Sequence, residues 1–471
     1  MQNSAPRASA TLEIGPAFQG QQFSPGDDGY DAARAVYNGM VDKRPALIAR
    51  CTGTADVVDA VALAREGKLP LAVRCGGHSV AGNGVSDGGV LIDLSGMKGV
   101  HVDPDARVAR ANGGVLWGEF DRETQLFGLA TPGGRVTTTG VGGFTLGGGY
   151  GWLSTKWGLA CDNLISAQVV TADGRVVTAS ADENADLLWG LRGGGGNFGV
   201  VTSYEFQLHE LDPTVMAGLV VHPLDDAVEI GRAWRDWVEA APPEVGSSLV
   251  VFIAPPEPFI PAELQGKPAL MILAMFAGDA DEGEAVLRPL KEQIGPPAVD
   301  AIDRMPYTAF QTIVDGFSPK GWLNYHRGEH LVALSDDAIA AHVEHGRRVK
   351  SPMSYSVVFH HGGAISAVDE EATASSDRDA PYMWHPIAAW TDPADSEREI
   401  NWVRESSAAM APFTTGGVYL NFEPDVGEAQ VRAGFSAESY DRLVALKDRW
   451  DPENLFHINP NIPPSRQPAN T

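Results

Sequence analysis

The sequence has few cysteines and little positive charge for its length. Its three cysteines, Cys51, Cys75 and Cys161, are too few among 471 residues for a secreted disulfide scaffold and fit a reduced cytoplasm. Lys and Arg number 35 against 61 Asp and Glu, which gives a formal net charge of −26. Nucleic acids and anionic membrane surfaces bind clustered positive charge. We therefore expect neither as a partner.

Long hydrophobic runs are missing as well. No stretch of about 18 apolar residues occurs, and the amino terminus has no basic segment followed by an apolar one. We expect neither a membrane span nor export, and we predict a cytoplasmic protein that is a monomer or a homodimer. The composition, 44% hydrophobic and 20% charged, is typical of globular proteins. The length predicts roughly two or three domains.

A change in glycine content and in the pattern of predicted strands and helices divides the chain into three parts. Glycine-dense segments with short predicted strands and helices fill residues 1–210. From about Leu211 glycine becomes sparse, and strand-like runs and helices continue to residue 413, which predicts a sheet covered by helices. Residues 414–471 return to the first character. The predicted class is α+β. The predicted helix 227–241 has an apolar stripe formed by Ala227, Ile230, Trp234, Trp237 and Val238, which indicates core packing.

Two glycine motifs match known patterns in letters but not in context. GGGGNFG at 193–199 contains G-x-G-x-x-G, yet the following residues VVTSYEFQL predict a strand, whereas a Rossmann dinucleotide site requires a helix there. GVSDG at 84–88 contains G-x-S-x-G but runs into the strand VLIDL, so it forms no nucleophile elbow.

His342 and His345, on a predicted helix, have no cysteine or carboxylate partner at a metal-ligand spacing. We expect no metal site.

The loop RCGGHSVAGNG at 74–84 carries the most informative chemistry. Consecutive residues with small side chains let backbone N–H groups point inward and bind a pyrophosphate without basic side chains. His78 stands at the centre of this loop, where a neutral imidazole nitrogen can act as a nucleophile or a ligand. The spacing is equally compatible with a tight turn that carries an incidental histidine.

Five segments in order resemble the berberine-bridge-enzyme-like branch of the vanillyl-alcohol-oxidase flavoproteins. They are residues 74–97, 132–174, 187–208, 417–422 and 448–464. The resemblance covers nearly the whole chain. It implies a two-domain PCMH-type fold in which residues 1–210 and 414–471 form an FAD-binding domain. Residues 211–413 would then form an inserted substrate domain, an antiparallel sheet covered by helices.

The resemblance also implies how FAD is held. It implies a covalent bond from a ring nitrogen of His78 to the 8α-methyl carbon of the flavin. The position of a second, cysteine link in many relatives is Val136 here, so we expect a single attachment. A histidine that follows the paired glycines in the family is Phe144 here, and other donors must then stabilise the flavin N1–C2 edge. The further residues expected to bind the cofactor are Arg74, Cys75, Gly76, Gly77, Ser79, Val80, Gly82, Thr138, Gly142, Gly143, Gly149, Gly199, Val201, Asn421 and Asn459.

The resemblance assigns catalytic positions too. Tyr419, in GVYLNF, matches the family's tyrosine, and we predict that it is the base, with Asn421 on the same side of a strand. Its alternative role is to orient the substrate. Thr139 matches the position that controls oxygen access to the flavin, and its small size favours an oxidase. Tyr150 and Trp152 are expected to line the substrate side of the flavin.

Together these features predict an FAD-dependent oxidase that removes a hydride from an alcohol, a phenol or a carbon–nitrogen bond and reduces O2 to H2O2. His385 and Asp377 are polar candidates to assist the base. The net charge disfavours small anionic substrates. Alternatives are a carbohydrate oxidase, an oxidative or non-redox cyclase, and a binding protein without turnover. An aromatic secondary metabolite is the expected substrate, on the evidence of four aromatic residues in the substrate domain, namely Trp322, Tyr325, Tyr355 and Trp384.

Overall fold

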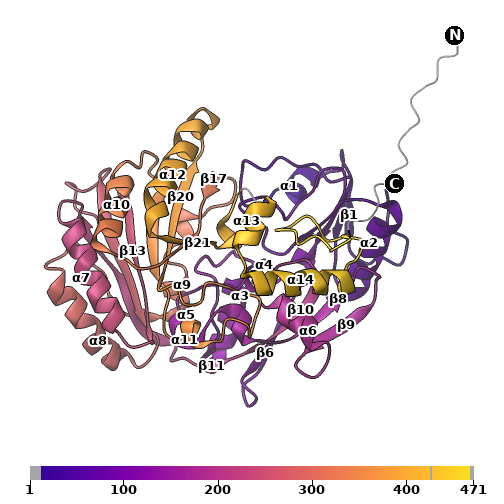
Figure 1. Cartoon of the computed structure of the whole chain (residues 1–471), viewed down its shortest axis with the longest axis horizontal. Helices are drawn as coiled ribbons and strands as arrows, with labels where there is room; N and C mark the ends of the chain where they lie inside the picture. Colours follow the sequence, from indigo (N-terminus) through magenta and orange to yellow (C-terminus); the bar gives the residue numbers. More distant parts are fainter. Residues whose placement is uncertain (1–11, 425–426, 467–471) are drawn as a thin grey trace, which may run out of the picture.

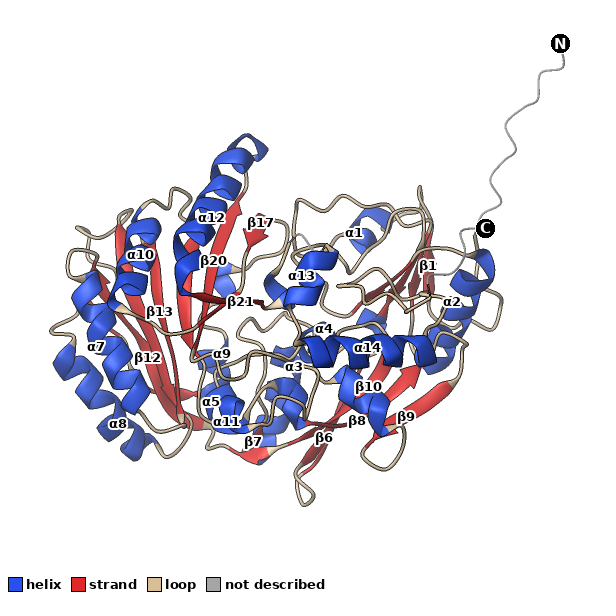
Figure 2. Cartoon of the chain, viewed as in Figure 1, coloured by secondary structure: helices blue, strands red, loops and turns tan. Residues whose placement is uncertain are grey.

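The computed structural model describes residues 12–424 and 427–466. Figure 1 shows the amino-terminal part and the carboxy-terminal helices together at one end of the molecule, with the middle of the chain at the other end. Helices and strands are mixed throughout the described residues (Figure 2), which confirms the predicted α+β class. Cys51, Cys75 and Cys161 are free thiols.

The first sheet is built around a β-α-β unit. α2 (Thr54–Gly67) connects β2 (Leu47–Arg50) to β3 (Leu71–Arg74), and both strands pair in parallel with β4 (Val90–Asp93). Parallel strands are covered on both faces, which explains their nearly continuous apolar sequences. β3 ends where the loop with His78 begins. β1 (Gln21–Phe23) pairs with β2 at the opposite edge of this sheet, and α1 (Tyr30–Arg34) follows β1 in the chain.

An antiparallel sheet follows, with strand order β5-β6-β10-β8-β9. The glycine segment 193–199 leads directly into β10, so the predicted strand is confirmed and no Rossmann helix forms there. The strands are β5 (Val100–Asp103), β6 (Val108–Asn112), β8 (Leu164–Val170), β9 (Val176–Ser180) and β10 (Val200–Gln207). A small pair joins β7 (Leu129–Ala130) to β11 (His209–Glu210). The helices of this region are α3 (Trp117–Thr124), α4 (Val141–Leu146), α5 (Ser154–Trp157) and α6 (Ala185–Leu191).

The middle of the chain forms a large antiparallel sheet with the order β15-β12-β14-β13-β19-β20-β18-β21, where β16 also pairs with β12 and β17 with β20. The strands are β12 (Thr214–Pro223), β13 (Val245–Ile253), β14 (Pro268–Phe276), β15 (Val299–Asp300), β16 (Asp303–Pro306), β17 (Leu323–His326), β18 (Glu329–Leu331), β19 (Tyr355–His360), β20 (Tyr382–Trp390) and β21 (Thr414–Val418). The helices are α7 (Ala227–Ala240), α8 (Ala280–Gln293), α9 (Tyr307–Gln311), α10 (Asp336–Arg347), α11 (Ala364–Ala367) and α12 (Ser396–Met410).

The two faces of this large sheet have different partners. Leu249 and Val251 of β13 pack with the helices on the outer face, where α7, α8, α10 and α12 lie in Figure 1. Val250 and Phe252 point the other way because side chains alternate along a strand. The apolar stripe of α7 is buried as predicted. The inner face of the sheet is thereby left to line the cavity described below.

The carboxy-terminal segment returns to the first end of the molecule. α14 (Ala437–Trp450) lies there beside α6, and α13 (Glu428–Ala433) lies beside β21 near the centre of the molecule (Figure 1). The fully buried Lys447 ammonium donates to Asn197 O at 2.9 Å and to Phe456 O at 2.9 Å, and it pairs with Asp451 Oδ2 at 2.7 Å. This buried network ties the glycine segment 193–199 to the tail of the chain.

Candidate active site

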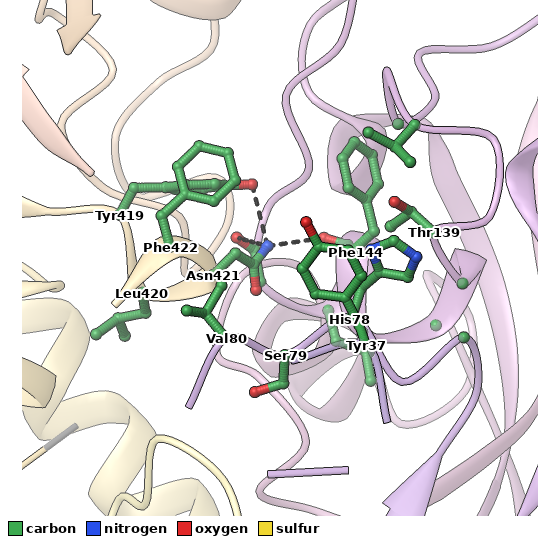
Figure 3. A pocket seen from close by; sticks show the side chains of 18 of the residues that line it. Tyr37, His78, Ser79, Val80, Thr139, Phe144, Tyr419, Leu420, Asn421 and Phe422 are labelled. Atoms are coloured by element: carbon green, nitrogen blue, oxygen red, sulfur yellow. Dashed lines mark hydrogen bonds between the residues drawn. The ribbon is translucent and has the colours of Figure 1, made fainter. Parts of the chain in front are cut away.

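A cavity of about 380 Å³ lies between the inner face of the large sheet and the sheets that contain β3 and β10. Its wall is assembled from residues as far apart in the sequence as Tyr37 and Pro460. Figure 3 shows Tyr419, Leu420, Asn421 and Phe422 on one side and His78, Tyr37 and Thr139 on the other. The volume is within the usual range for small-molecule sites.

Most residues predicted from the sequence line this cavity. They are Arg74, Cys75, Gly76, Gly77, His78, Ser79, Val80, Thr139, Gly142, Gly143, Tyr150, Gly199, Val201, Tyr419, Asn421 and Asn459. Gly82, Thr138 and Gly149 are not part of the wall. Thr138 and Gly149 nevertheless contact residues that are, through hydrogen bonds to His78 and Tyr419. Gly82 lies in the turn that follows, where its N–H donates to Ser79 O and its φ is 70°.

The glycines bring two loops into close contact beneath the cavity. A Cβ on Gly76 would lie 2.4 Å from Gly140 N, and a Cβ on Gly140 would lie 2.3 Å from Gly76 N, so neither position accepts a side chain. Burial raises the pKa of the Cys75 thiol between them to about 11, so this cysteine stays protonated at neutral pH. A Cβ on Gly143 would meet nothing within 4 Å, and its backbone is accessible from the cavity. This geometry fits a backbone cradle for a nucleotide.

His78 is held in one orientation at the edge of this cradle. Its Nε2 is hydrogen-bonded to Thr138 Oγ1 at 2.8 Å, and its ring stacks on Tyr37 with the centroids 4.4 Å apart and the planes at 17° (Figure 3). Burial lowers the pKa of the imidazole to about 4. His78 is therefore neutral at pH 7, the form in which an imidazole nitrogen is nucleophilic.

Tyr419 and Asn421 meet, but not on a strand as predicted. β21 ends at Val418, and Leu420–Phe422 form a short 3-10 turn. The reason is that the partner strand β18 is short, and the backbone pairing finishes where Tyr419 N donates to Gly328 O. The turn places Asn421 Nδ2 3.0 Å from Tyr419 Oη (Figure 3).

The hydroxyl of Tyr419 is surrounded by donors. It accepts hydrogen bonds from Asn421 Nδ2 and from Gly149 N, each at 3.0 Å. Burial raises the pKa of Tyr419 to about 12, and these two donors act in the opposite direction because they stabilise the phenolate. Tyr419 is therefore protonated at neutral pH, with its oxygen held by two donors.

Arg135 is a cavity residue that the sequence did not single out. Its guanidinium carbon lies over three rings, 4.4 Å from the centroid of Tyr150, 4.1 Å from Trp152 and 3.9 Å from Phe359. Its three side-chain nitrogens are buried and have no acceptor at hydrogen-bonding geometry among the described residues. The Tyr150 hydroxyl donates elsewhere, to His360 O at 2.7 Å. An arginine inside the segment PGGRVTTTG was the available signal.

The two polar residues expected to assist the base, His385 and Asp377, lie in different places. His385 lines the cavity and is 2% exposed, and neither of its ring nitrogens has a partner among the residues described. Burial, followed by His326 and Arg135, holds its pKa well below the usual range. Asp377 instead lies beside Gly417 outside the cavity wall, so its expected place near the base is wrong.

The four aromatic residues expected at the substrate are mostly elsewhere. Tyr355 lines the cavity, but Tyr325 packs with α12, Trp384 packs on the outer face of the large sheet, and Trp322 is not part of the wall. A residue of the large sheet reaches the cavity only if its side chain lies on the inner face of the sheet. Other aromatic residues therefore line the cavity. The aromatic side chains that line the cavity include Tyr37, Tyr150, Trp152, Phe317, Tyr355, Phe359, Tyr419 and Phe422.

Residues 12–424 and 427–466 contain no group of three or more His, Cys, Asp or Glu side chains placed to hold a metal ion. In the same ranges no helix is both long and apolar enough to cross a bilayer.

The glycine-lined cradle and the aromatic chamber beside it fit a nucleotide cofactor next to a small-molecule substrate. Comparison with known proteins identifies the class as the FAD-linked oxidoreductases. Residues 45–180 match the FAD binding domain family, and residues 418–463 match the family described as berberine and berberine like. The chain is 32% identical over 466 residues to (R)-6-hydroxynicotine oxidase of Paenarthrobacter nicotinovorans, covering 97% of this chain and 99% of that protein. It is 28% identical to glucooligosaccharide oxidase of Sarocladium strictum, covering 91% and 89%.

Solved structures show the same fold. The crystal structure of 6-hydroxy-D-nicotine oxidase from Arthrobacter nicotinovorans matches with a TM-score of 0.86 at 28% identity, covering 97% of this chain and 99% of that one. BBE-like 1 of Physcomitrella patens matches in fold with a TM-score of 0.85 at 22% identity, covering 96% and 98%. The chain belongs to the berberine-bridge-enzyme-like family of FAD-linked oxidases with the PCMH-type fold, as the sequence predicted.

Proposed function

We propose that this protein is an oxidase with FAD attached through His78, acting on an aromatic or conjugated alcohol, phenol or carbon–nitrogen substrate, with O2 as the electron acceptor. The observation that carries the proposal is the neutral, oriented imidazole of His78 in a backbone cradle. When bound, FAD accepts a hydride from the substrate and passes the electrons to oxygen.

The residues around the cavity fit FAD. Small residues of the loop 74–84 and of the segment 193–199 line the cavity, so a ligand can approach their backbone closely. Asn459 Nδ2 donates to Gly196 O at 3.0 Å, which fixes the second segment. Thr138 occupies Nε2 of His78, which leaves Nδ1 as the ring nitrogen for the bond. Thr139, small and on the cavity wall, leaves room for oxygen to approach.

Tyr419 is placed to move the substrate proton. A hydroxyl or amine loses a hydride more easily once its proton is withdrawn. The donors Gly149 N and Asn421 Nδ2 stabilise a phenolate on Tyr419, and the guanidinium of Arg135 in the same chamber favours that negative charge as well. The chain thus supplies a proton acceptor with three stabilising partners.

The wall of the chamber favours a flat substrate over a sugar. It is mostly aromatic and aliphatic on the side of the large sheet, and no Asp or Glu occurs among the described residues that line it. Carbohydrates bind through many hydrogen bonds, for which carboxylates are suitable acceptors, whereas planar rings gain by stacking on aromatic faces. This is the support for an aromatic or conjugated substrate, with a secondary metabolite as the expected class.

The test joins a spectrum with a turnover assay. The denatured, precipitated protein is examined for yellow colour and for the added mass of FAD, and the native protein is screened for peroxide release with aromatic alcohols, phenols and amines. We expect colour that survives denaturation, together with oxygen consumption. A colourless precipitate overturns the attachment to His78. A yellow protein that is reduced by a substrate without consuming oxygen overturns the oxidase.

A further inference from the structure

The chamber contains a buried positive charge without a negative partner. The side-chain nitrogens of Arg135 have no acceptor at hydrogen-bonding geometry among the described residues, and their contacts are the faces of Tyr150, Trp152 and Phe359. Ring faces attract a guanidinium but offer it no hydrogen-bond acceptors. Burial lowers the pKa of Arg135, and the nearby Tyr150 hydroxyl acts to raise it through its charge and as a hydrogen-bond partner. Burial also raises the pKa of Tyr150, and its hydroxyl donates to His360 O, so this hydroxyl is neutral and gives the guanidinium no negative charge. A buried guanidinium without hydrogen-bond acceptors is energetically unfavourable. We therefore expect a bound molecule to supply the acceptor.

The rest of the wall supplies no such acceptor. None of the described residues that line the cavity is an Asp or Glu, although the whole chain has 61 of them. The other arginine of the wall, Arg74, is already paired with the buried Asp93 at 2.8 Å. Arg135 is therefore the charge available to a bound molecule, and its sign is opposite to the net charge of the protein.

A second unpartnered group lies on the same side of the chamber. His385 is 2% exposed with both ring nitrogens unpartnered among the described residues, and it sits next to Phe359, the ring that Arg135 covers. The register β19–β20 pairs Val357 with His385 and Phe359 with Met383, which places these side chains on one face of the sheet. Arg135 and His385 thus both contact Phe359, and neither has a carboxylate partner within the part of the chain that the structure describes.

We propose that Arg135, assisted by His385, forms a subsite for an anionic oxygen of a conjugated or aromatic substrate, either a carboxylate or a phenolate. The guanidinium donates paired hydrogen bonds to such a group, and the rings of Tyr150, Trp152 and Phe359 cover the flat body attached to it. A protonated amine in the same chamber would face the guanidinium with no carboxylate to offset the repulsion. The net charge of −26 disfavours anions in bulk, and the local arrangement reverses that preference. This inference rests on the proposed function because it names the substrate class of that site.

The test measures binding to the holoenzyme by calorimetry and by the change in the visible flavin spectrum. The probes are benzoate, 4-nitrophenolate, benzyl alcohol and benzylamine. We expect benzoate or 4-nitrophenolate to bind at least about tenfold more tightly than benzyl alcohol, the ratio expected of a charge-assisted hydrogen bond, with benzylamine the weakest. Tight binding of benzoate alone identifies a carboxylate subsite, and tight binding of 4-nitrophenolate alone identifies a phenolate subsite.

Two variants sharpen the result. Arg135→Met removes the charge but keeps the length of the side chain, and we expect it to abolish the preference for the anion over benzyl alcohol. Arg442→Met is the matched control, because Arg442 also lies over a ring, 3.7 Å from Trp189, but outside the cavity. Anion binding that is unchanged in Arg135→Met, or a preference for benzylamine in the unmodified enzyme, overturns the proposal. If Arg135→Met fails to fold, the order of the four probes on the unmodified enzyme decides.

The two proposals fail separately. A protein without flavin colour after denaturation contradicts the function proposed above, while calorimetry with benzoate still tests the subsite. A yellow oxidase whose anion binding ignores Arg135 contradicts the subsite alone.

Discussion

The side-chain amide of Asn421 donates to the hydroxyl of Tyr419 across a single 3-10 turn, 3.0 Å from Nδ2 to Oη. The same hydroxyl accepts from Gly149 N, so two elements distant in the sequence fix one oxygen. This arrangement makes the proton chemistry of Tyr419 depend on its neighbours.

Tyr419→Phe should slow anaerobic reduction of the flavin by about 10²–10⁴, the range for loss of a general base. Because burial raises the pKa of Tyr419 to about 12, the reduction rate of the unmodified enzyme should increase with pH across the accessible alkaline range. Asn421→Leu removes one donor and should move this rise to still higher pH. Stopped-flow reduction at several pH values measures both effects. An unchanged rate in Tyr419→Phe would show that the ring only packs.

His78→Ala should yield protein whose flavin is released on acid precipitation. The pKa of His78, lowered to about 4 by burial, predicts that attachment of FAD to the apoprotein is independent of pH near neutrality and fails below about pH 4, where the imidazole is protonated. Flavin remaining in the washed precipitate is the measurement. His101→Ala, on the exposed edge strand β5, is the control and should keep its flavin. Flavin retained by His78→Ala would refute the attachment site.

Thr139→Leu should slow reoxidation of the flavin by oxygen and leave reduction unchanged. Thr139 lines the cavity, and a leucine adds bulk where oxygen would approach. Mixing the reduced enzyme with oxygenated buffer gives the reoxidation rate. Thr137→Leu, two residues earlier and outside the wall, controls for disturbance of the loop. Equal slowing of both half-reactions in Thr139→Leu would count against a role in oxygen access.

Asp121 should make stability depend on pH. Its side chain is 1% exposed and accepts from Gln311 Nε2 at 2.7 Å, and burial raises its pKa to about 7. The folded state therefore holds a proton that the unfolded chain releases near pH 4. The protonated carboxyl of Asp121 therefore contributes on the order of 4 kcal/mol to the free energy of unfolding. This stabilisation is fully present below pH 4 and is lost as the pH rises through about 7.

The matched variant is Asp121→Asn, which keeps an acceptor for Gln311 Nε2 and adds a donor for the unpartnered Gln311 Oε1. Urea unfolding at pH 5 and pH 8 measures the effect. We expect the free energy of unfolding to differ less between the two pH values in Asp121→Asn than in the unmodified protein. The same difference in both proteins would rule out Asp121 as its source.

Much of the fold and part of the site could be predicted from the sequence. The conformation of the glycine loop around His78 could be predicted, because it depends on residues adjacent in the sequence, including Gly77 and Gly82 with their positive φ angles. The helix stripe of α7 follows from its period. Such features depend on residues that the sequence places side by side.

Other features depend on contacts that no local pattern contains. Arg135 meets Phe359 across more than two hundred residues, and a run of letters does not show that the two share a chamber. Tyr419 leaves its predicted strand because its partner β18 is short, which is a property of a different segment. Trp384 is of a residue type that often contacts substrates. Its position on β20, however, turns its side chain toward the helices on the outer face of the large sheet. Which face an alternating strand presents is settled by packing alone.

Part of the cavity wall comes from residues 456–460, which contact the glycine segment 193–199. Asn197 Nδ2 donates to Pro460 O at 3.1 Å, and Lys447 and Asn459 hold the same glycine segment. Without residues 447–460 the chamber would lack one wall, even though the loop that carries His78 would be complete. A variant truncated before Lys447 should therefore lose its grip on the cofactor while keeping the residue proposed to bond it.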